Sequence, residues 1–259
     1  MTQPPVSLAY DVQGRPDAPA VFLAPSLGTT WEVFDDLAAA LLPTYRAVRF
    51  DTRGHGRSPV PDGPYTMQQL ADDVVALADL LGIARFGVVG LSLGGCIAQQ
   101  LALTHAERLS AVVLCCTLPK FGEPAQWRDR AASVRAEGMA VLDEGTRLRW
   151  FTEATRTERP ELVEHYIDML TGTPVEGYAA CCGALAGFDA TDRLAEVGVP
   201  TRVIAGAEDP VATVERAGRL AAAIPGADLV VVDGASHIAC AEQPDSFHAA
   251  VTDHLDRQL

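Results

Sequence analysis

The stretch Gly87-Val88-Val89-Gly90-Leu91-Ser92-Leu93-Gly94-Gly95 places one serine among glycines, between two different sequence patterns. The short apolar run at residues 85–89 is typical of a buried strand, and residues 96–104 are typical of an amphipathic helix. The segment Gly90-Leu91-Ser92-Leu93-Gly94 fits G-x-S-x-G, in which a serine occupies a sharp turn from a strand into a helix. We therefore expect the Ser92 hydroxyl to be exposed at the carboxyl end of a strand.

The geometry of such a turn explains why Gly90 and Gly94 are glycines. Side chains two residues before and two residues after the serine would collide on such a turn, so both positions must be nearly empty. The strained backbone costs on the order of 1–3 kcal/mol, which the surrounding fold must offset. The N–H of Leu93 lies at the positive end of the following helix, where it is a candidate donor to an oxyanion.

Strand-like and helix-like segments alternate along most of the chain. Strands are expected at residues 8–12, 20–24, 47–50, 85–89, 111–115, 201–205 and 228–232. Helices are expected at residues 31–42, 65–81, 96–104, 211–224 and 244–255. This alternation predicts an α/β protein with a mostly parallel, buried central sheet and helices on both faces.

The alternation stops near Pro119 and resumes after Asp189. Helical patterns follow one another between these residues, at 124–137, 139–142, 147–154, 159–170 and 174–186. We expect residues 119–187 to form an inserted helical lid (cap), and residues 1–118 and 188–259 to form the core. The lid's aromatic residues are expected to form its own small core or the roof of a pocket: Trp127, Trp150, Phe151, Tyr166 and Tyr178.

The charge balance excludes several classes of partner. The 259 residues include 34 acidic and 20 basic side chains, for a net charge of −14. Nucleic acids and anionic membranes bind basic surfaces, so neither is expected as a partner. A small anionic substrate would need a local positive charge. No apolar run is long enough to span a membrane, and residues 1–7 lack the features of a signal peptide, so we expect a cytoplasmic protein.

The cysteine pattern gives no support for a metal site or a disulfide framework. The six cysteines include the adjacent pairs Cys115-Cys116 and Cys181-Cys182, and no pair has C-x-x-C spacing. Adjacent cysteines do not easily bridge to each other. We therefore expect reduced thiols and no bound zinc.

Two further polar residues follow predicted strands at the end of the sheet where Ser92 is expected. Asp209 follows the strand at 201–205, and His237 follows the strand at 228–232. Open parallel sheets bind ligands beyond the carboxyl ends of their strands. A serine hydroxyl needs a base to become a nucleophile near neutral pH. We expect His237 to be that base and Asp209 to orient its imidazole, in the chain order of an α/β-hydrolase.

The sequence leaves alternatives for two of these roles. Glu208 is a second candidate for the acid, and Asp209 before Pro210 also fits a turn residue. His55 is a second candidate for the base, but it lies in a glycine turn that is typical of a rigid loop held by side-chain hydrogen bonds. The other histidines lie in predicted helices: His105, His165, His248 and His254. Next to the serine turn, the loop after residue 24 offers the N–H of Leu27 as a second oxyanion donor.

Over nearly its full length the chain resembles the 3-oxoadipate enol-lactonases of the α/β-hydrolase superfamily. The segments that carry the resemblance are Ser26-Leu27-Gly28-Thr29, Asp51-Thr52-Arg53-Gly54-His55-Gly56-Arg57-Ser58, Gly90-Leu91-Ser92-Leu93-Gly94-Gly95, Trp127 with Arg130, Trp150-Phe151-Thr152, Glu176-Gly177-Tyr178-Ala179-Ala180-Cys181-Cys182, Ala205-Gly206-Ala207-Glu208-Asp209-Pro210 and Ala235-Ser236-His237. The glycine turn around His55 and the serine turn are common to many α/β-hydrolases. The segments Ser26-Leu27-Gly28-Thr29 and Glu176-Gly177-Tyr178-Ala179-Ala180-Cys181-Cys182 are more specific to the enol-lactonases. Pro25, Phe34 and Leu93 stand where that family usually has Asn, Trp and Met.

The resemblance implies hydrolysis of a five-membered enol-lactone that carries an acetate arm, with no metal or organic cofactor. Ser92 would attack the ring carbonyl, and water activated by His237 would release 3-oxoadipate, a step in the bacterial breakdown of protocatechuate and catechol. Trp127 is expected to line the pocket and Arg130 to bind the substrate carboxylate, because they lie at helical spacing i, i+3. The alternative for Arg130 is a solvated face shared with Arg128 and Arg135.

Other functions share the same residues. The triad and lid also serve carboxylesterases, C–C bond hydrolases and cofactor-free haloperoxidases, and a substrate panel separates these enzymes. A ligand sensor that keeps the hydrolase fold is an alternative from another class, for which a ligand-dependent partner would be expected. The sequence carries no signal for the oligomeric state.

Overall fold

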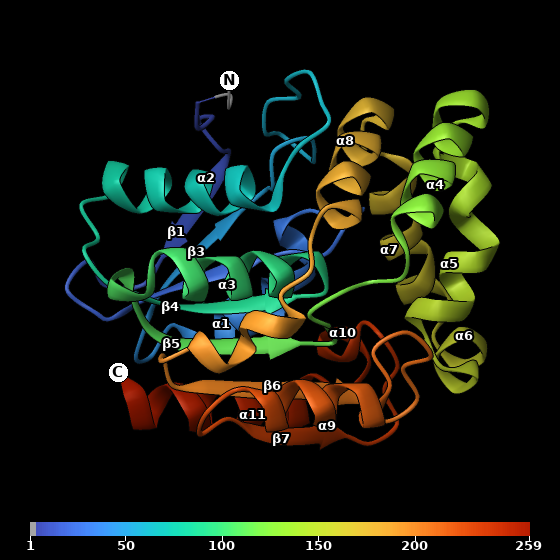
Figure 1. Cartoon of the computed structure of the whole chain (residues 1–259). Coiled ribbons are helices and arrows are strands. Elements are labelled where there is room, and N and C mark those ends of the chain that lie inside the picture. The colour runs from blue at the N-terminus through green and yellow to red at the C-terminus, as the bar shows by residue number, and fades with distance from the viewer. Residues whose placement is uncertain (1–3) are drawn as a thin grey trace.

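The structure is a computed structural model that describes residues 4–259 (Figure 1). Residues 1–3, part of the segment considered above for a signal peptide, lie outside the described residues. One seven-stranded sheet has the order β1-β3-β2-β4-β5-β6-β7, and all neighbouring strands are parallel except β1 with β3. The strands are β1 (Tyr10–Gln13), β2 (Ala20–Ala24), β3 (Arg46–Phe50), β4 (Phe86–Leu91), β5 (Leu109–Cys115), β6 (Thr201–Gly206) and β7 (Asp228–Val232).

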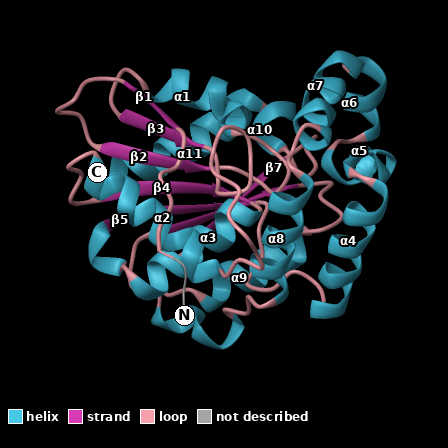
Figure 2. Cartoon of the chain, turned by 90° about the horizontal axis from the view of Figure 1, so that it is seen from above, coloured by secondary structure: helices cyan, strands magenta, loops and turns pink. Residues whose placement is uncertain are grey.

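Helices cover both faces of this sheet (Figure 2). On one face lie α1 (Asp35–Leu41) and α11 (Pro244–Gln258); on the other lie α2 (Met67–Leu80), α3 (Leu93–Thr104) and α9 (Val214–Ala223). Every residue of β2, β4 and β6 is buried, as the apolar sequences of these strands require. The predicted mostly parallel sheet with helices on both faces is confirmed. None of the helices described within residues 4–259 is long and apolar enough to cross a membrane.

Five α-helices lie between β5 and β6: α4 (Pro124–Glu137), α5 (Asp143–Trp150), α6 (Glu153–Glu158), α7 (Pro160–Thr171) and α8 (Val175–Ala186). They gather beyond one end of the sheet, the end at which the parallel strands terminate (Figure 1). Within the group, α4 packs against α8, and α5 and α6 pack against α7. The helices therefore stand over the strand ends that carry the candidate site.

Two predicted helices have the wrong bounds for identifiable reasons. The helix predicted at residues 147–154 is two helices, because Phe151 is extended (φ −129°, ψ 144°) and the Thr152 side chain caps α6 by accepting a hydrogen bond from the Thr155 N–H. The helix predicted from residue 211 begins only at Val214, because residues 211 and 212 are held by a side chain of the candidate site described below.

Smaller differences occur at other element ends. Residues 31–34 form a 3₁₀ turn (Trp31–Phe34) before α1, and the first strand begins at Tyr10 rather than residue 8. Three short elements were not predicted: the 3₁₀ helices Ala106–Arg108 and Thr191–Glu196, and α10 (Ala239–Glu242). Helix α2 begins at Met67, inside the predicted range 65–81, because Thr66 and Gln69 form a reciprocal capping box in front of it.

Helix α8 touches the core through backbone atoms. A Cβ on Gly177 would overlap the carbonyl oxygen of Gly54, and a Cβ on Gly54 would overlap the backbone of Gly177. Nearby, the N–H of Tyr65 donates to the carbonyl of Ala180 at 3.1 Å. Glycine at both contact positions is therefore what lets α8 pack this closely on the loop after β3.

Gly177→Ala tests this contact. The added methyl group has no space against Gly54, so we expect the variant to lose roughly 1–3 kcal/mol of unfolding free energy, measured by urea denaturation. Gly187→Ala is the matched control, because a Cβ there would meet only ordinary contacts at 3.7 Å and beyond. Equal stability of the two variants would contradict the packing described here.

Candidate active site

The register of the sheet brings three loops to one edge. Ala24 of β2 pairs with Gly90 of β4, and Gly206 of β6 pairs with Val232 of β7. Because these parallel strands end nearly level, the residues that follow them lie side by side. Ser92 directly follows β4, and the loops that contain Asp209 and His237 follow β6 and β7.

Ser92 occupies a strained turn of the kind that its glycine neighbours predict. Its backbone has φ 54° and ψ −107°, a region that non-glycine residues rarely occupy. The Ser92 N–H donates to the carbonyl of Cys115 at 2.9 Å, which holds the turn against β5. A Cβ on Gly90 would overlap the backbone of Gly94, and a Cβ on Gly94 would overlap the carbonyl oxygen of Ala24.

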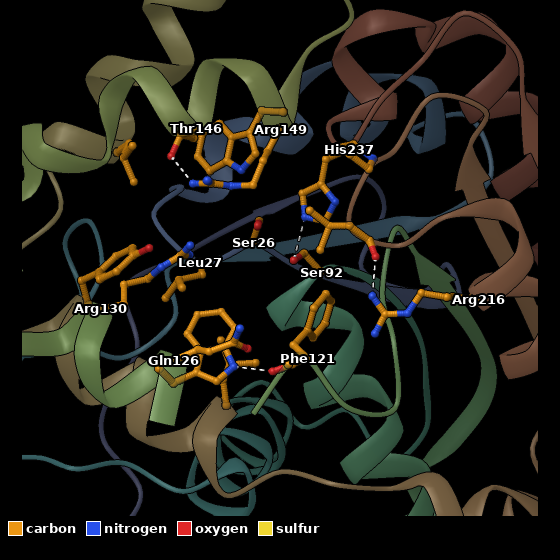
Figure 3. A pocket seen from close by; sticks show the side chains of 18 residues that line it. Ser26, Leu27, Ser92, Phe121, Gln126, Arg130, Thr146, Arg149, Arg216 and His237 are labelled. Atoms are coloured by element: carbon orange, nitrogen blue, oxygen red, sulfur yellow. Dashed lines mark hydrogen bonds between the residues drawn. The ribbon is translucent and has the colours of Figure 1, made fainter. Parts of the chain in front are cut away.

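A continuous chain of hydrogen bonds joins the three predicted residues. Asp209 Oδ2 lies 2.7 Å from His237 Nδ1. On the other side of the ring, His237 Nε2 lies 2.9 Å from Ser92 Oγ, the link drawn in Figure 3. All three side chains are largely shielded, with exposed fractions of 3%, 5% and 9% for Asp209, His237 and Ser92. With the Nδ1 proton donated to Asp209, Nε2 of His237 is left to accept the proton of the Ser92 hydroxyl.

Asp209, rather than its neighbour Glu208, contacts the histidine. Burial alone would raise the pKa of Asp209, but His237 and two backbone N–H donors outweigh it and lower the pKa below its usual value. The donors are the N–H groups of Val211 and Ala212, at 2.7 and 3.0 Å from Oδ1. Glu208 is exposed. The carboxylate beside the imidazole is therefore ionised and fixed in orientation.

Two backbone N–H groups next to Ser92 are available to an oxyanion. Leu27 lines the same pocket as Ser92, and within residues 4–259 no hydrogen bond uses its N–H. Leu93 is the first residue of α3, so its N–H has no acceptor inside the helix. These are the positions that the sequence proposes for the oxyanion donors.

His55 is a structural histidine in this arrangement. It is fully buried, its Nε2 accepts the N–H of Gly28 at 2.9 Å, and its Nδ1 lies 3.4 Å from the carbonyl of Arg53. Burial lowers the pKa of His55 to about 4, so the ring is neutral at neutral pH. His55 thus holds the loop that follows Leu27, and the structure agrees with the interpretation of its glycine turn as a rigid loop.

Replacing His55 tests this role through pH. The folded pKa lies below the unfolded value of about 6.5, so the unfolded chain binds the extra proton between pH 6.5 and 4. The contribution of neutral His55 to stability is therefore complete above pH 6.5 and declines as the pH falls. We expect wild type to lose about 2 kcal/mol more unfolding free energy than His55→Gln between pH 7.5 and pH 5. Parallel pH profiles for the two proteins would refute a buried neutral His55.

A cavity of about 380 Å³ opens above Ser92 and His237 (Figure 3). Three of the five expected aromatic residues line it, namely Trp127, Trp150 and Tyr178. The other two, Phe151 and Tyr166, are buried against each other with ring centroids 5.6 Å apart. Arg130 also lines the cavity, with its guanidinium 5.1 Å from the centre of the Trp127 ring.

Sequence reasoning missed two other cations of this cavity. Arg149 and Arg216 line it together with Arg130, and none of the 18 lining residues is acidic. The one available signal for Arg149 is its position next to the Trp150-Phe151-Thr152 segment. Arg216 lies in α9 and carries no local signature. Within residues 4–259, no group of three or more His, Cys, Asp or Glu side chains is arranged to hold a metal ion.

Sequence reasoning also missed Glu242, whose side chain supports the loop that contains His237. Its buried carboxylate accepts hydrogen bonds from the N–H and hydroxyl of Thr152 at 2.8 and 2.9 Å, and from the N–H of Ser236 at 2.5 Å. The N–H of Ile238 donates to the carbonyl of Trp150 at 3.1 Å. These bonds tie the junction of α5 and α6 to the residues on either side of His237.

Glu242→Gln tests this support. Both carboxylate oxygens face N–H donors, so an amide nitrogen in place of either oxygen meets a donor. We expect a loss of about 1–3 kcal/mol in unfolding free energy and a lower kcat, because His237 follows Ser236 directly. Glu208→Gln is the control: it is exposed, and unchanged activity there also excludes Glu208 as the acid. A Glu242→Gln enzyme with wild-type stability and kcat would contradict the role assigned to Glu242.

Comparisons with known proteins agree with this geometry. The family model described as alpha/beta hydrolase fold matches residues 19–244. The chain belongs to the α/β-hydrolase family.

Within the α/β-hydrolases, the chain is 39% identical over 251 residues to 3-oxoadipate enol-lactonase 2 of Acinetobacter baylyi, covering 97% of this chain and 94% of that one. The crystal structure of the enol-lactonase from Burkholderia xenovorans LB400 superposes with a TM-score of 0.93 at 40% identity, over 96% of both chains. A thermophilic esterase from Thermogutta terrifontis gives a TM-score of 0.93 at 30% identity, over 96% of this chain and 93% of that one. The predicted resemblance, the hydrolase fold and the expectation of an ester-hydrolysing enzyme are confirmed.

Proposed function

We propose that this α/β-hydrolase cleaves the ring ester of 3-oxoadipate enol-lactone to give 3-oxoadipate through an acyl-enzyme on Ser92. The observation that carries the proposal is the chain of hydrogen bonds from Asp209 through His237 to Ser92, which ends in a cavity lined by arginines and by no acid. The 39% identity to a 3-oxoadipate enol-lactonase over nearly the whole chain supports the choice of substrate.

In the first half-reaction, Ser92 Oγ attacks the ring carbonyl while His237 Nε2 takes its proton. The N–H groups of Leu27 and Leu93 stabilise the oxyanion that forms, and each such donor contributes on the order of 3 kcal/mol in the transition state. Collapse of the intermediate breaks the bond to the enol oxygen, and His237 Nε2 gives its proton to that leaving oxygen. The released enol then tautomerises to a ketone. That tautomerisation makes the ring opening hard to reverse.

In the second half-reaction, His237 takes a proton from water, and the water oxygen attacks the acyl carbon. Collapse of this second intermediate returns the proton to Ser92 Oγ and releases 3-oxoadipate. Asp209 stabilises the imidazolium that forms in both halves, which requires it to be charged. No metal or organic cofactor takes part in this scheme, and cytoplasmic breakdown of aromatic compounds is the proposed setting.

We assign residues 119–187 as a lid over this chemistry. Its α4 and α5 supply Trp127, Arg130 and Trp150 to the cavity wall, while Ser92 comes from the core. The indole N–H of Trp127 donates to the carbonyl of Phe121, which fixes the ring in place. Trp127 then bounds the lactone ring, and Arg130 faces the cavity as a partner for the substrate carboxylate.

A carboxylesterase is the second candidate function. It is favoured by the TM-score of 0.93 and 30% identity to the Thermogutta terrifontis esterase. An esterase would use the same Ser92 acyl-enzyme, so the two candidates differ only in which substrate is processed efficiently.

Ser92→Ala and Asp209→Asn test the chemistry. With 3-oxoadipate enol-lactone followed by ultraviolet absorbance, we expect Ser92→Ala to lose on the order of 10⁶-fold in kcat and Asp209→Asn on the order of 10⁴-fold. Both variants should melt near the wild-type temperature, and a serine-directed phosphonate should label only proteins that retain Ser92. Near-wild-type turnover by Ser92→Ala would remove Ser92 as the nucleophile.

The same assay separates the two candidate functions. For an enol-lactonase, kcat/KM for the lactone exceeds kcat/KM for simple alkyl and aryl esters by orders of magnitude. The opposite order, with Ser92 still required, would make the protein an esterase and leave the proposed chemistry intact.

A further inference from the structure

The cavity above Ser92 is basic in a chain that is strongly acidic overall. Arg130, Arg149 and Arg216 line it without any carboxylate, although the chain carries 34 acidic residues and a net charge of −14. Across residues 4–259, none of these three arginines takes part in an ion pair. A positive cavity in a negative protein requires an explanation.

The three most deeply buried arginines of this chain have acidic partners. The fully buried arginines are each paired: Arg49 with Asp11 and Asp35, Arg53 with Asp73, and Arg202 with Asp228 and Asp253. The pattern extends to the helices between β5 and β6, where Arg135 pairs with Glu176 and Arg147 with Asp143 and Glu164. Within residues 4–259 the half-buried Arg46 and Arg156 also lack an ion pair, but neither lines the cavity, whereas Arg130 and Arg149 lack one at the same cavity.

Arg149 is the most constrained of the three. It is half-buried, and its one side-chain hydrogen bond goes to the hydroxyl of Thr146, at 3.1 Å from Nη2 (Figure 3). Burial and the nearby charge of Arg130 lower the pKa of Arg149. The guanidinium has five N–H donors, and most of them have no protein acceptor within residues 4–259.

Arg130 completes the arrangement from α4. It lies over the Trp127 ring and beside the phenol of Tyr178, so its guanidinium is held at the same wall of the cavity as Arg149. Two cations held close together in a partly desolvated place repel each other. An anion between them would remove that repulsion and supply acceptors for both guanidinium groups.

Arg216 differs from this pair. It is exposed, and its Nη1 donates to the carbonyl of Val211 at 2.7 Å, on the other side of Ser92 and His237 from Arg130 (Figure 3). This hydrogen bond supports the loop whose Val211 and Ala212 N–H groups bind Asp209, which explains the position of Arg216. The anion site is therefore placed at the Arg130 and Arg149 wall.

We propose that Arg149, acting with Arg130, binds a substrate carboxylate and makes the enzyme selective for lactones and esters that carry a negative charge beyond the scissile group. This inference rests on the proposed hydrolysis at Ser92 and names the class of substrate that reaches it. Arg149 is a binding residue and takes no part in bond making or breaking.

The proposal predicts where the effect appears in the kinetics. The carboxymethyl arm of the enol-lactone stays charged and unaltered while the ring ester is cleaved. Arg149 then binds the arm equally in the ground state and in the transition state, which is uniform binding. Loss of Arg149 should raise KM for the charged substrate and leave kcat nearly unchanged.

Arg149→Met tests the site with a matched pair of substrates. One is 3-oxoadipate enol-lactone, and the other is the same ring with a methyl group in place of the carboxymethyl arm. We expect KM for the charged lactone to rise roughly 10- to 100-fold, the range of a hydrogen bond to a charged group, and kinetics on the neutral lactone to change less than about twofold. Arg149→Lys should fall between the two proteins, because it keeps the charge and loses the planar fork.

Arg128→Met is the matched control. It changes the net charge by the same amount and lies on α4 with Arg130, but it is exposed and outside the cavity. It should leave both lactones unaffected. Equal losses for Arg128→Met and Arg149→Met, or equal losses on both lactones for Arg149→Met, would overturn the site.

A second pair of measurements separates failure of this site from failure of the proposed function. The esters mono-4-nitrophenyl succinate and 4-nitrophenyl butyrate differ in charge and are assayed alongside calorimetric titration with adipate. If wild type prefers the succinate ester and binds adipate, and Arg149→Met loses both properties, the site stands even where the enol-lactone is not turned over. If wild type shows neither the preference nor adipate binding, the site is refuted, whatever the enzyme does with the enol-lactone.

Discussion

The whole site depends on one residue held in a backbone conformation that it would not adopt alone. Ser92 has φ 54°, and the fold maintains it through main-chain bonds on both sides. Its N–H donates to Cys115, and its carbonyl accepts the Thr117 hydroxyl at 2.8 Å and the N–H of Cys96 at 3.1 Å. Because Cys115 is the last residue of β5 and Thr117 follows it closely, displacing the serine would also displace the centre of the sheet.

Two histidines near this turn show how environment decides a role. His237 and His55 both lie in loops beyond strand ends, and both are shielded from water. His237 has an ionised carboxylate on one side and a hydroxyl on the other, so its ring links the charged Asp209 to a hydroxyl with which it can exchange a proton. His55 has a backbone N–H and a backbone carbonyl, and no carboxylate, so its ring stays neutral and orients a loop.

The sequence was sufficient for the features that rest on local patterns. The glycines around Ser92, the strand that precedes it and the capping residues of α2 each fix their own conformation, so their positions could be read directly. The candidate triad was also accessible, because parallel strands end at one edge and each member follows such an end. The start of α9 was missed because the N–H groups of residues 211 and 212 donate to the Asp209 carboxylate. Helix propensity contains no information about such a contact.

Glu242 and Arg149 were missed for a different reason. The partners of Glu242 lie 90 residues away at Thr152 and 6 residues away at Ser236, and neither spacing belongs to a known local motif. Arg147 pairs with Asp143 and Glu164, whereas Arg149 lines the cavity and has no ion pair within residues 4–259, which is a property of the assembled fold. Features defined by long-range contacts, or by the lack of a partner, cannot be derived from composition or periodicity.

The Glu242 bridge also has a mechanical consequence. Helix α5 ends at Trp150, whose carbonyl and following residues are bonded to both sides of the His237 loop. A rigid-body movement of α5 and α6 away from the sheet would break the hydrogen bonds between Thr152 and the Glu242 carboxylate and would move His237 away from Ser92. We therefore expect the junction of α5 and α6 to stay attached to the His237 loop throughout turnover, so that the alignment of His237 with Ser92 persists from one turnover to the next.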